Sequence, residues 1–199
     1  MAAPACAPMG HRGPAYGLFP MTLAQLTSFL LLASAPALAQ TQCECEPSRP
    51  ETMKLRQCSL CSEAEKQTSE IFFLKDISPR KPNRWLALPR RHRPGLHHLH
   101  ELSASERTRL FTAAIEKAKQ LWGADWGIAY NGPKVRTQCH LHLHIGKLLK
   151  GVETDRAVVV VSSPAQIPVP PFQGLWLHGH GKHIHVHFNE QLTETVLMR

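Results

Sequence analysis

The pattern of apolar and polar positions predicts a mixed structure of short strands and one long helix. Two apolar runs, 71–74 and 85–88, flank a stretch rich in Lys, Pro and Asn, 75–83. Prolines and Asn between short apolar runs are typical of a loop between strands. We therefore expect two antiparallel strands at 71–74 and 85–88.

A helix is predicted at 103–122. Ser103 and Glu106 have the spacing of a capping box, in which each side chain bonds the other residue's backbone N–H. Apolar residues then repeat at helical spacing up to Gly123, a residue type that favours the C-terminal end of a helix. The repeating positions are Leu110, Phe111, Ala114, Ile115, Ala118, Leu121 and Trp122.

The second half of the chain is patterned as strands. Apolar or alternating segments lie at 126–130, 139–148 and 157–161, and the last of these, with four consecutive valines, is typical of a buried strand. A proline-rich loop, 164–171, precedes a hairpin, 174–180 and 183–188, that turns near Gly181. We expect an α+β fold with an antiparallel sheet of about five strands, a main domain at 56–150 and a C-terminal β-hairpin extension of the same domain at 151–199.

The first 39 residues have the features of a signal peptide. They hold one charged side chain, Arg12, and an apolar run that ends in Ala37-Leu38-Ala39, an A-x-A cleavage motif. An uncleaved membrane anchor is the alternative, and Met21 is an alternative start. Residues 40–55 are poor in apolar side chains, so we expect a flexible lead-in.

The charge favours an anionic ligand. The formal net charge is +8, and removal of Arg12 with the signal peptide leaves +7. Phosphates, nucleotides, nucleic acid and anionic lipid headgroups all suit such a field. Because aromatic residues are not interleaved with the basic ones, nucleic acid is disfavoured as a partner.

Histidine is the unusual residue of this chain, with 13 copies. Along 139–148, His140, His142 and His144 alternate with Leu141, Leu143 and Ile145, so in a strand the three imidazoles share one face. A solvent-facing strand with incidental histidines is the alternative. The regular row favours chemistry or metal binding.

These residues resemble the histidine-triad (HIT) superfamily, whose signature alternates histidine with hydrophobic residues. The matching pieces are His140 to Ile145, Arg136-Thr137-Gln138 and the stretch Leu88-Pro89-Arg90-Arg91-His92. The resemblance covers about residues 58–148 and implies a HIT-like antiparallel sheet over the 56–150 domain. It departs from many members at Val135-Arg136, where they have Gly-Gln, and at Arg84, where they have histidine.

The resemblance implies a hydrolase that cleaves phosphate anhydrides. By position, His142 would attack phosphorus and form a phosphohistidine, with His144 beside it. Neutral imidazole is a good nucleophile near neutral pH when its second nitrogen is held by a hydrogen bond, which a backbone carbonyl supplies in this family. Thr137 and Arg136 would bind the phosphate, although both could be ordinary edge-strand residues. The expected substrate-binding residues are Asn131, Gln138 and Arg84.

The order of Arg136-Thr137-Gln138 and Leu141-His142-Leu143-His144-Ile145 also resembles the CDP-diacylglycerol pyrophosphatase family. That family acts at the outer side of a membrane, which agrees with an exported basic protein. The substrate is then a nucleotide or a nucleotide-linked lipid. Association with a membrane surface and a homodimer formed through the sheet follow from the same resemblances.

The cysteines present two alternatives. Cys58 and Cys61 have the spacing with which two thiolates hold one zinc ion. The HIT resemblance would supply His92 and His140 as the other ligands of this structural zinc. Export instead favours disulfides, either between Cys58 and Cys61 or with Cys43 or Cys45, because oxidising compartments pair thiols. Five cysteines of the mature chain leave at least one unpaired or bound to metal.

The remaining histidines are less specific. His97, His98 and His100 are expected to be solvated. The hairpin carries five more, at 178, 180, 183, 185 and 187. Metal binding, phosphate contact and a plain polar face are all open there. A second functional class, a non-enzymatic exported metal-binding protein, would use these histidines together with the cysteines.

Overall fold

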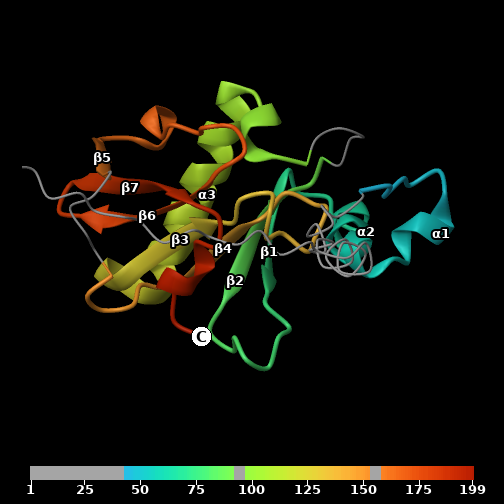
Figure 1. The fold of residues 1–199 in the computed structure, drawn as a ribbon, viewed down its shortest axis with the longest axis horizontal. Helices are drawn as coiled ribbons and strands as arrows, with labels where there is room; N and C mark the ends of the chain where they lie inside the picture. Colours follow the sequence, from blue (N-terminus) through green and yellow to red (C-terminus); the bar gives the residue numbers. More distant parts are fainter. Residues whose placement is uncertain (1–42, 92–96, 153–157) are drawn as a thin grey trace, which may run out of the picture. The chain divides into compact units, whose positions relative to one another are not determined.

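The computed structural model describes residues 43–91, 97–152 and 158–199. The signal peptide or anchor expected at 1–39, residues 40–42 of the lead-in, and His92 lie outside the described residues. The chain forms an α+β fold with one seven-stranded antiparallel sheet and one main helix (Figure 1). The strands are β1 (Ile71–Lys75), β2 (Trp85–Pro89), β3 (Trp126–Tyr130), β4 (Leu143–Lys147), β5 (Val158–Val161), β6 (Gly174–His180) and β7 (His183–Glu190).

Helix α3 (Ala104–Trp122) confirms the predicted helix and its caps. The Ser103 side chain accepts a hydrogen bond from the backbone N–H of Glu106, and Glu106 returns the contact. The helix ends at Gly123, whose φ of 57° is a conformation that glycine adopts without strain. Its apolar face packs on β2, β3 and β4 and buries Leu110, Phe111, Ala114, Ile115 and Ala118.

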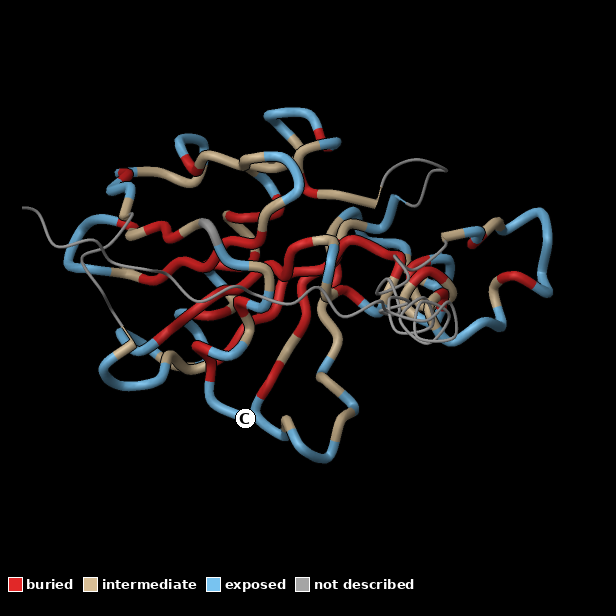
Figure 2. Tube along the Cα trace, in the orientation of Figure 1, coloured by how far each residue is buried: buried red, intermediate tan, exposed pale blue. Residues whose placement is uncertain are grey.

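The sheet has the strand order β1-β2-β4-β3-β6-β7-β5. The C-terminal hairpin is therefore continuous with the main sheet, because β6 pairs with β3. Figure 2 shows the buried chain running along the central strands. Strand β5 lies at the edge, with Val159 and Val160 exposed, so the expected buried strand at 157–161 is wrong for those two residues.

The two faces of the sheet differ in chemistry. On one face, Ile128, Ile145 and Leu177 pack with the helix. On the other face, cross-strand pairs run from β4 to β7. His144 lies opposite Ala129, Ala129 opposite Trp176, and Trp176 opposite His187. Directly opposite residues of antiparallel strands point to the same face. His144 and His187 therefore lie on the face away from α3.

The N-terminal lead-in is ordered from Cys43 onward, contrary to expectation. Cys45 is buried and Thr52 is bonded to the backbone of Glu46 and Arg49. Disulfides to the domain fix this segment in place of an apolar core of its own. Three short helical elements follow one another here, α1 (Pro50–Met53), η2 (Arg56–Cys58) and α2 (Ser59–Glu65).

The C-terminal residues cover part of the polar face of the sheet. Leu197 packs over Gly127 and Gly146, where a β-carbon on either glycine would lie within about 3.1 Å of its side chain. The remaining short elements are 3-10 turns, η3 (Leu99–Glu101), η4 (Gly123–Asp125), η5 (Pro164–Gln166) and η6 (Glu194–Val196). The last of these places Glu194 beside the first histidine row.

Candidate functional site

A single cavity of about 850 Å³ brings together most of the residues expected to bind and cleave substrate. Its volume is within the range of small-molecule and cofactor sites. The sequence-predicted residues in its wall are Asn131, Arg136, Thr137, Gln138, His142 and His144. Arg84 and His140 are not among its lining residues.

His142 is fixed by a hydrogen bond to the backbone. It precedes β4, so the strand expected at 139–148 is shorter than predicted at its N-terminal end. Its Nδ1 donates to the carbonyl oxygen of His140 at 2.8 Å. Burial holds the pKa of His142 well below its ordinary value, and the positive charge of Arg136 acts in the same direction. The ring is therefore neutral, with its proton on Nδ1 and a lone pair on Nε2.

His144 lies edge-on to His142, with 4.9 Å between ring centroids. The Asn131 Oδ1 accepts hydrogen bonds from the backbone of Thr193 and Glu194, so its amide nitrogen faces His144 Nε2 at 3.4 Å. The other ring nitrogen, Nδ1, lies 3.5 Å from the Glu194 carboxylate. Burial, with the charges of Lys81 and Arg84, lowers the pKa of His144 to about 3. Its contact with Glu194 is therefore not an ion pair at neutral pH.

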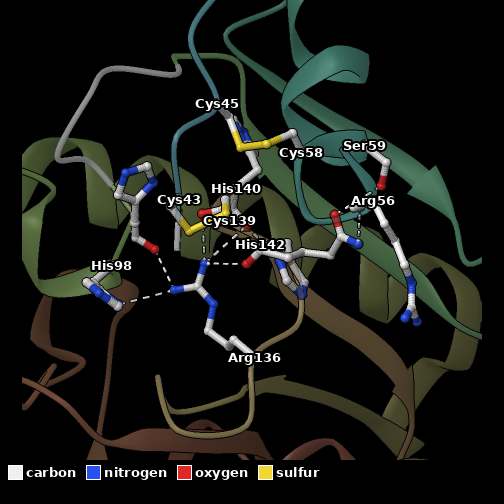
Figure 3. Close-up of a disulfide and its surroundings, with 12 residues drawn as sticks. Cys43, Cys45, Arg56, Cys58, Ser59, His98, Arg136, Cys139, His140 and His142 are labelled. Carbon is white, nitrogen blue, oxygen red and sulfur yellow. Dashed lines mark hydrogen bonds between the residues drawn. A yellow bond between two sulfur atoms is a disulfide. The ribbon is translucent and has the colours of Figure 1, made fainter. Parts of the chain in front are cut away.

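Arg136 lines the cavity, but both terminal nitrogens of its guanidinium are bonded to groups of the protein, which does not favour its expected role as a phosphate ligand. One terminal nitrogen donates to the carbonyls of Gln138, Cys139 and His140 at 3.1–3.2 Å. The other contacts the His97 carbonyl, His98 Nδ1 and the Tyr130 hydroxyl. Figure 3 shows this fan of bonds around Arg136. Because the His140 carbonyl also accepts from His142, Arg136 positions the group that orients the histidine.

Arg84 is a structural residue and not a substrate ligand. Its side chain is 1% exposed, and its nitrogens donate to the carbonyls of Met198, Glu194 and Leu197. It also pairs with the Glu194 carboxylate at 2.9 Å. A buried cation requires such partners, and here they are supplied by residues more than a hundred positions away. Arg84 thereby holds the C-terminal segment over the sheet.

The other predicted binding residues lie on the cavity wall. Thr137 is exposed, so its hydroxyl is accessible from the cavity. Gln138 is tied to the helical segment, because its amide oxygen accepts from Ser59 and its nitrogen donates to the Arg56 carbonyl.

Several charged residues of the cavity were not identified from the sequence. Lys75 ends β1, Arg80 and Lys81 come from the loop between β1 and β2, and Arg56 comes from η2. Glu194 is the one described acid beside His144, and Lys81 binds it at 2.6 Å. Burial by itself would raise the pKa of Glu194, but Lys81 and Arg84 outweigh burial and lower it. The basic residues of the loop could have been identified from the sequence as phosphate-binding candidates, whereas Glu194 belongs to no motif.

The cysteines form disulfides in place of the expected zinc site. Cys58 is bonded to Cys45, and Cys43 to Cys139 (Figure 3). Pairing of Cys58 with Cys45 was one of the alternatives in the sequence. A sulfur within a disulfide is not a thiolate ligand, so a zinc site built on Cys58 and Cys61 does not fit this oxidised state.

The other two proposed zinc ligands give no further support. His140 Nε2 lies 2.7 Å from the carbonyl oxygen of Pro89, which anchors this histidine to β2. Cys61 is the free cysteine of the described residues, and burial raises the pKa of its thiol to about 12. The sulfurs of Cys45, Cys58 and Cys139 lie within 4.8 Å of one another, so this buried cluster has the dimensions of a metal site only when it is reduced.

The histidines before α3 are not solvated as expected. His97 and His98 are half-buried, and burial lowers the pKa of each. His98 receives the contact from Arg136 and stacks on His100 at 5.4 Å between ring centroids. The His97 carbonyl and His98 Nδ1 contact the guanidinium of Arg136 and help to hold it in place.

The disulfides indicate an oxidising, non-cytoplasmic compartment. Within the described residues, no helix has the length and apolar character needed to cross a membrane. A scan against protein-family models gives no match for the chain, and a search of curated proteins gives none.

Proposed function

We propose that this protein is an exported hydrolase of phosphate anhydrides that works through a covalent intermediate on His142. The observation that carries the proposal is the neutral imidazole of His142, held by the His140 carbonyl, in the wall of a cavity lined by five Lys and Arg side chains and three acidic ones. The resemblance of 136–145 to the HIT superfamily agrees with it. Export to the periplasm or the extracellular space is part of the same proposal, and the disulfides support it.

The chemistry follows from the protonation state of the ring. The Nε2 lone pair of His142 attacks phosphorus, a nitrogen–phosphorus bond forms, and the bond to the leaving group breaks with its electron pair. The Nδ1 proton stays on the ring, where the His140 carbonyl stabilises the positive charge of the adduct. Water then attacks phosphorus, the nitrogen–phosphorus bond breaks with its electron pair returning to Nε2, and the proton of the water passes to solvent.

The cavity supplies charge complementary to a phosphate substrate. Lys75, Arg80 and Arg56 can contact anionic oxygens as charge builds on them. Lys81 is already paired with Glu194. Thr137 offers a hydroxyl, so it keeps its proposed role as a phosphate ligand, whereas Arg136 acts as a positioning residue.

A nucleotide-linked lipid such as CDP-diacylglycerol is the favoured substrate class. The cavity wall carries apolar side chains beside its cations, namely Leu60, Leu74, Ile77 and Leu86. Ile77 is 99% exposed on the same loop as the basic residues. Such a wall suits an anionic headgroup with an acyl chain attached, and it favours work at a membrane surface.

The experiment compares purified wild type with His142→Asn on CDP-diacylglycerol, on CDP and on adenosine phosphoramidate. Asparagine can still donate to the His140 carbonyl from its amide, but it has no nucleophilic ring nitrogen. The proposal predicts hydrolysis by the wild type and none by the variant. Equal rates in both proteins, or no hydrolysis of any of the three, would reject it. Preference for CDP over the lipid would retain the mechanism and reject the lipid class.

Zinc binding at the cysteine cluster is proposed only for the reduced chain. Reduction would free the grouped sulfurs of Cys45, Cys58 and Cys139. Bound zinc should then appear after reduction under nitrogen and be absent from the oxidised cluster. A Cys45→Ser/Cys58→Ser variant that binds as much zinc as wild type after reduction would overturn this assignment.

The second class, a non-enzymatic metal-binding protein, is supported by the histidines of the hairpin. It leaves the cavity, with its cations and neutral His142, without a role. Absence of any hydrolysis would favour it.

A further inference from the structure

An ordered loop presents an apolar side chain to solvent at the rim of the cavity. Ile77, between β1 and β2, lines the cavity and is 99% exposed, the largest exposed fraction among the large hydrophobic residues that the structure describes. The loop is held by its own bonds, since the Ser78 N–H donates to the Asp76 carboxylate at 2.9 Å and the Lys81 N–H donates to the Ser78 carbonyl at 2.8 Å. Leaving an isoleucine in water forgoes the free energy that burial in an apolar phase would supply.

A second segment of the cavity wall repeats this arrangement. Leu55, immediately before η2, is 44% exposed and lies between the exposed residues Lys54 and Arg56. Its backbone is fixed, because its carbonyl accepts from the Cys58 N–H at 2.9 Å. Arg56 and Ile77 line the same cavity, so the two exposed apolar side chains belong to one rim.

The rim carries positive charge that its neighbours do not neutralise. Four exposed cations flank the two apolar residues, and among the described residues none of them is in an ion pair, namely Lys54, Arg56, Lys75 and Arg80. The three acids of the cavity wall are already bonded to protein groups, Glu63 to Lys66, Asp76 to the Ser78 backbone and Glu194 to Lys81. An anionic partner is therefore favoured at this rim.

Apolar side chains between unpaired cations suit the surface of an anionic bilayer. The apolar groups enter the boundary between headgroups and acyl chains, while Lys and Arg stay among the anionic headgroups. A protein partner would instead be expected to cover a contiguous apolar patch. Here the exposed apolar groups are two single side chains on different segments, which a fluid bilayer accommodates without matching their shape.

We propose that residues 54–56 and the loop 75–81 form a docking surface for an anionic lipid bilayer, with Leu55 and Ile77 inserted at the level of the headgroups. This deepens the proposed function and rests on it for one point, that the bilayer also contains the substrate. Docking in this orientation opens the cavity of His142 onto the membrane. A lipid substrate then reaches the nucleophile without its acyl chains passing through water. Docking itself requires no hydrolysis.

The first test is sedimentation with vesicles of phosphatidylcholine, with or without phosphatidylglycerol. Wild type and variants are purified after export with their disulfides intact, so that they share the same N-terminus. Wild type should bind the anionic vesicles at least about tenfold more tightly than the neutral ones, and salt should weaken this binding. Equal affinity for both kinds of vesicle would overturn the proposal.

Two double variants test whether the rim supplies the charge. Lys54→Gln/Arg80→Gln should lower the affinity for anionic vesicles by about 20-fold, since each cation near the surface contributes about fivefold. The matched control Lys150→Gln/Lys182→Gln removes the same charge from exposed positions outside the cavity and should stay within about threefold of wild type. Equal losses in the two double variants would overturn the assignment of the surface.

Insertion of the loop is tested by changing its apolar residue. Ile77→Ser should lower the affinity for anionic vesicles by about tenfold. Leu121→Ser, at an exposed leucine of α3, should bind as wild type does. The fluorescence of Ile77→Trp should be quenched by lipids brominated in their acyl chains. Absence of added quenching, together with full binding by Ile77→Ser, would show that the loop stays in water and would contradict the proposal.

The variant His142→Asn separates docking from catalysis. It should bind anionic vesicles as wild type does while hydrolysing no substrate. Vesicle binding by a wild type that hydrolyses nothing would retain the docking surface and reject the enzyme. Hydrolysis of CDP by a wild type that binds no vesicles would retain the enzyme and reject the docking surface.

Discussion

The two histidine rows share a sequence pattern, and His144 and His187 share a sheet face, yet the rows differ in what surrounds them. At 140–144, the rings of His142 and His144 face a cavity with more basic than acidic side chains, and Arg136 holds the carbonyl that orients His142. At 178–187, the rings face Trp176 and one another across a continuous hairpin. Alternation therefore determines the face that histidines occupy, but the neighbouring strands and loops determine their chemistry. We propose the first row as a nucleophile site, whereas the second row is packed within the hairpin.

The largest expected effect is on the rate of hydrolysis, which should depend on the first histidine row and not on the second. His142→Asn should lower the rate of hydrolysis by at least about 10⁴-fold, because loss of a covalent nucleophile removes the main reaction path. His183→Asn, an exposed histidine at the start of β7, should leave the rate within about twofold of wild type. Steady-state kinetics on CDP-diacylglycerol measure both. Similar losses in the two variants would mean that the rows do not differ in this way.

The disulfides anchor only the first row. Cys43–Cys139 joins residues 96 positions apart, next to His140, whereas Cys45–Cys58 joins residues 13 apart. Since a longer closed loop constrains the unfolded chain more, Cys43→Ala/Cys139→Ala should lower the free energy of unfolding by about 4–5 kcal/mol, and Cys45→Ala/Cys58→Ala by about 3 kcal/mol. Urea titration tests the order. Hydrogen exchange should show 140–144 losing protection before β6 and β7, and the reverse order would contradict the anchoring.

Arg136 tests whether the first row depends on its supporting loop. Arg136→Lys keeps the charge, but one ammonium group cannot donate to the three carbonyls and also make the contacts of the second guanidinium nitrogen. We expect kcat to fall by about 100-fold with KM changed by less than about threefold, since the lost bonds orient His142 and do not bind substrate. Lys134→Arg, an exposed cation in the same loop, is the control. A rise in KM with unchanged kcat would return Arg136 to the role of phosphate ligand.

Acid should destabilise the protein through the first row. The pKa of His144 is about 3 in the folded chain, against an ordinary value of 6.5. Between these values the unfolded chain binds a proton that the folded chain does not, so the free energy of unfolding falls as pH falls. The expected loss is about 1.4 kcal/mol per pH unit for each such histidine, or about 2 kcal/mol between pH 6.5 and pH 5. Urea unfolding should show this slope reduced in His144→Gln, and an unchanged slope would contradict it.

The rate of hydrolysis should fall less in mild acid than it would if the nucleophilic histidine were solvated. The pKa of His142 lies well below its ordinary value, mainly because of burial. The neutral nucleophile is therefore present below pH 6.5, and the rate should fall only once the pH drops through this lowered pKa. A half-maximal rate at pH 6.5 would indicate that the ring is solvated in the working enzyme.

The sequence was sufficient for those features that depend on neighbouring residues. The capping box at Ser103, the glycine end of α3 and the turn at Gly181 all follow from local conformational preference, and the structure has each of them. Alternation at 140–144 predicted that three histidines share one strand face; His142 and His144 do line one cavity, but His140 and His142 precede β4, and His140 bonds the Pro89 carbonyl outside that cavity. The resemblance to the HIT superfamily, and not alternation, grouped Asn131, Thr137 and Gln138 with them, and these three line the same cavity.

Features that depend on distant partners were not predictable in this way. The burial of Arg84 requires the C-terminal segment, and the position of Arg136 requires three carbonyls exposed by an irregular loop. Likewise, no local signal distinguishes Cys45 from Cys61 as the partner of Cys58. In each case a polar group found its partner through tertiary packing, which a single sequence does not display.

The most direct test of the account is a search for the covalent intermediate itself. Wild type mixed with CDP-diacylglycerol, quenched rapidly without acid and digested, should yield a peptide containing His142 that carries the mass of a phosphorus-linked adduct. His142→Asn should yield none, and His183→Asn should yield as much as wild type. Turnover of the lipid with no adduct on His142, or an adduct on a different histidine, would contradict the central claim.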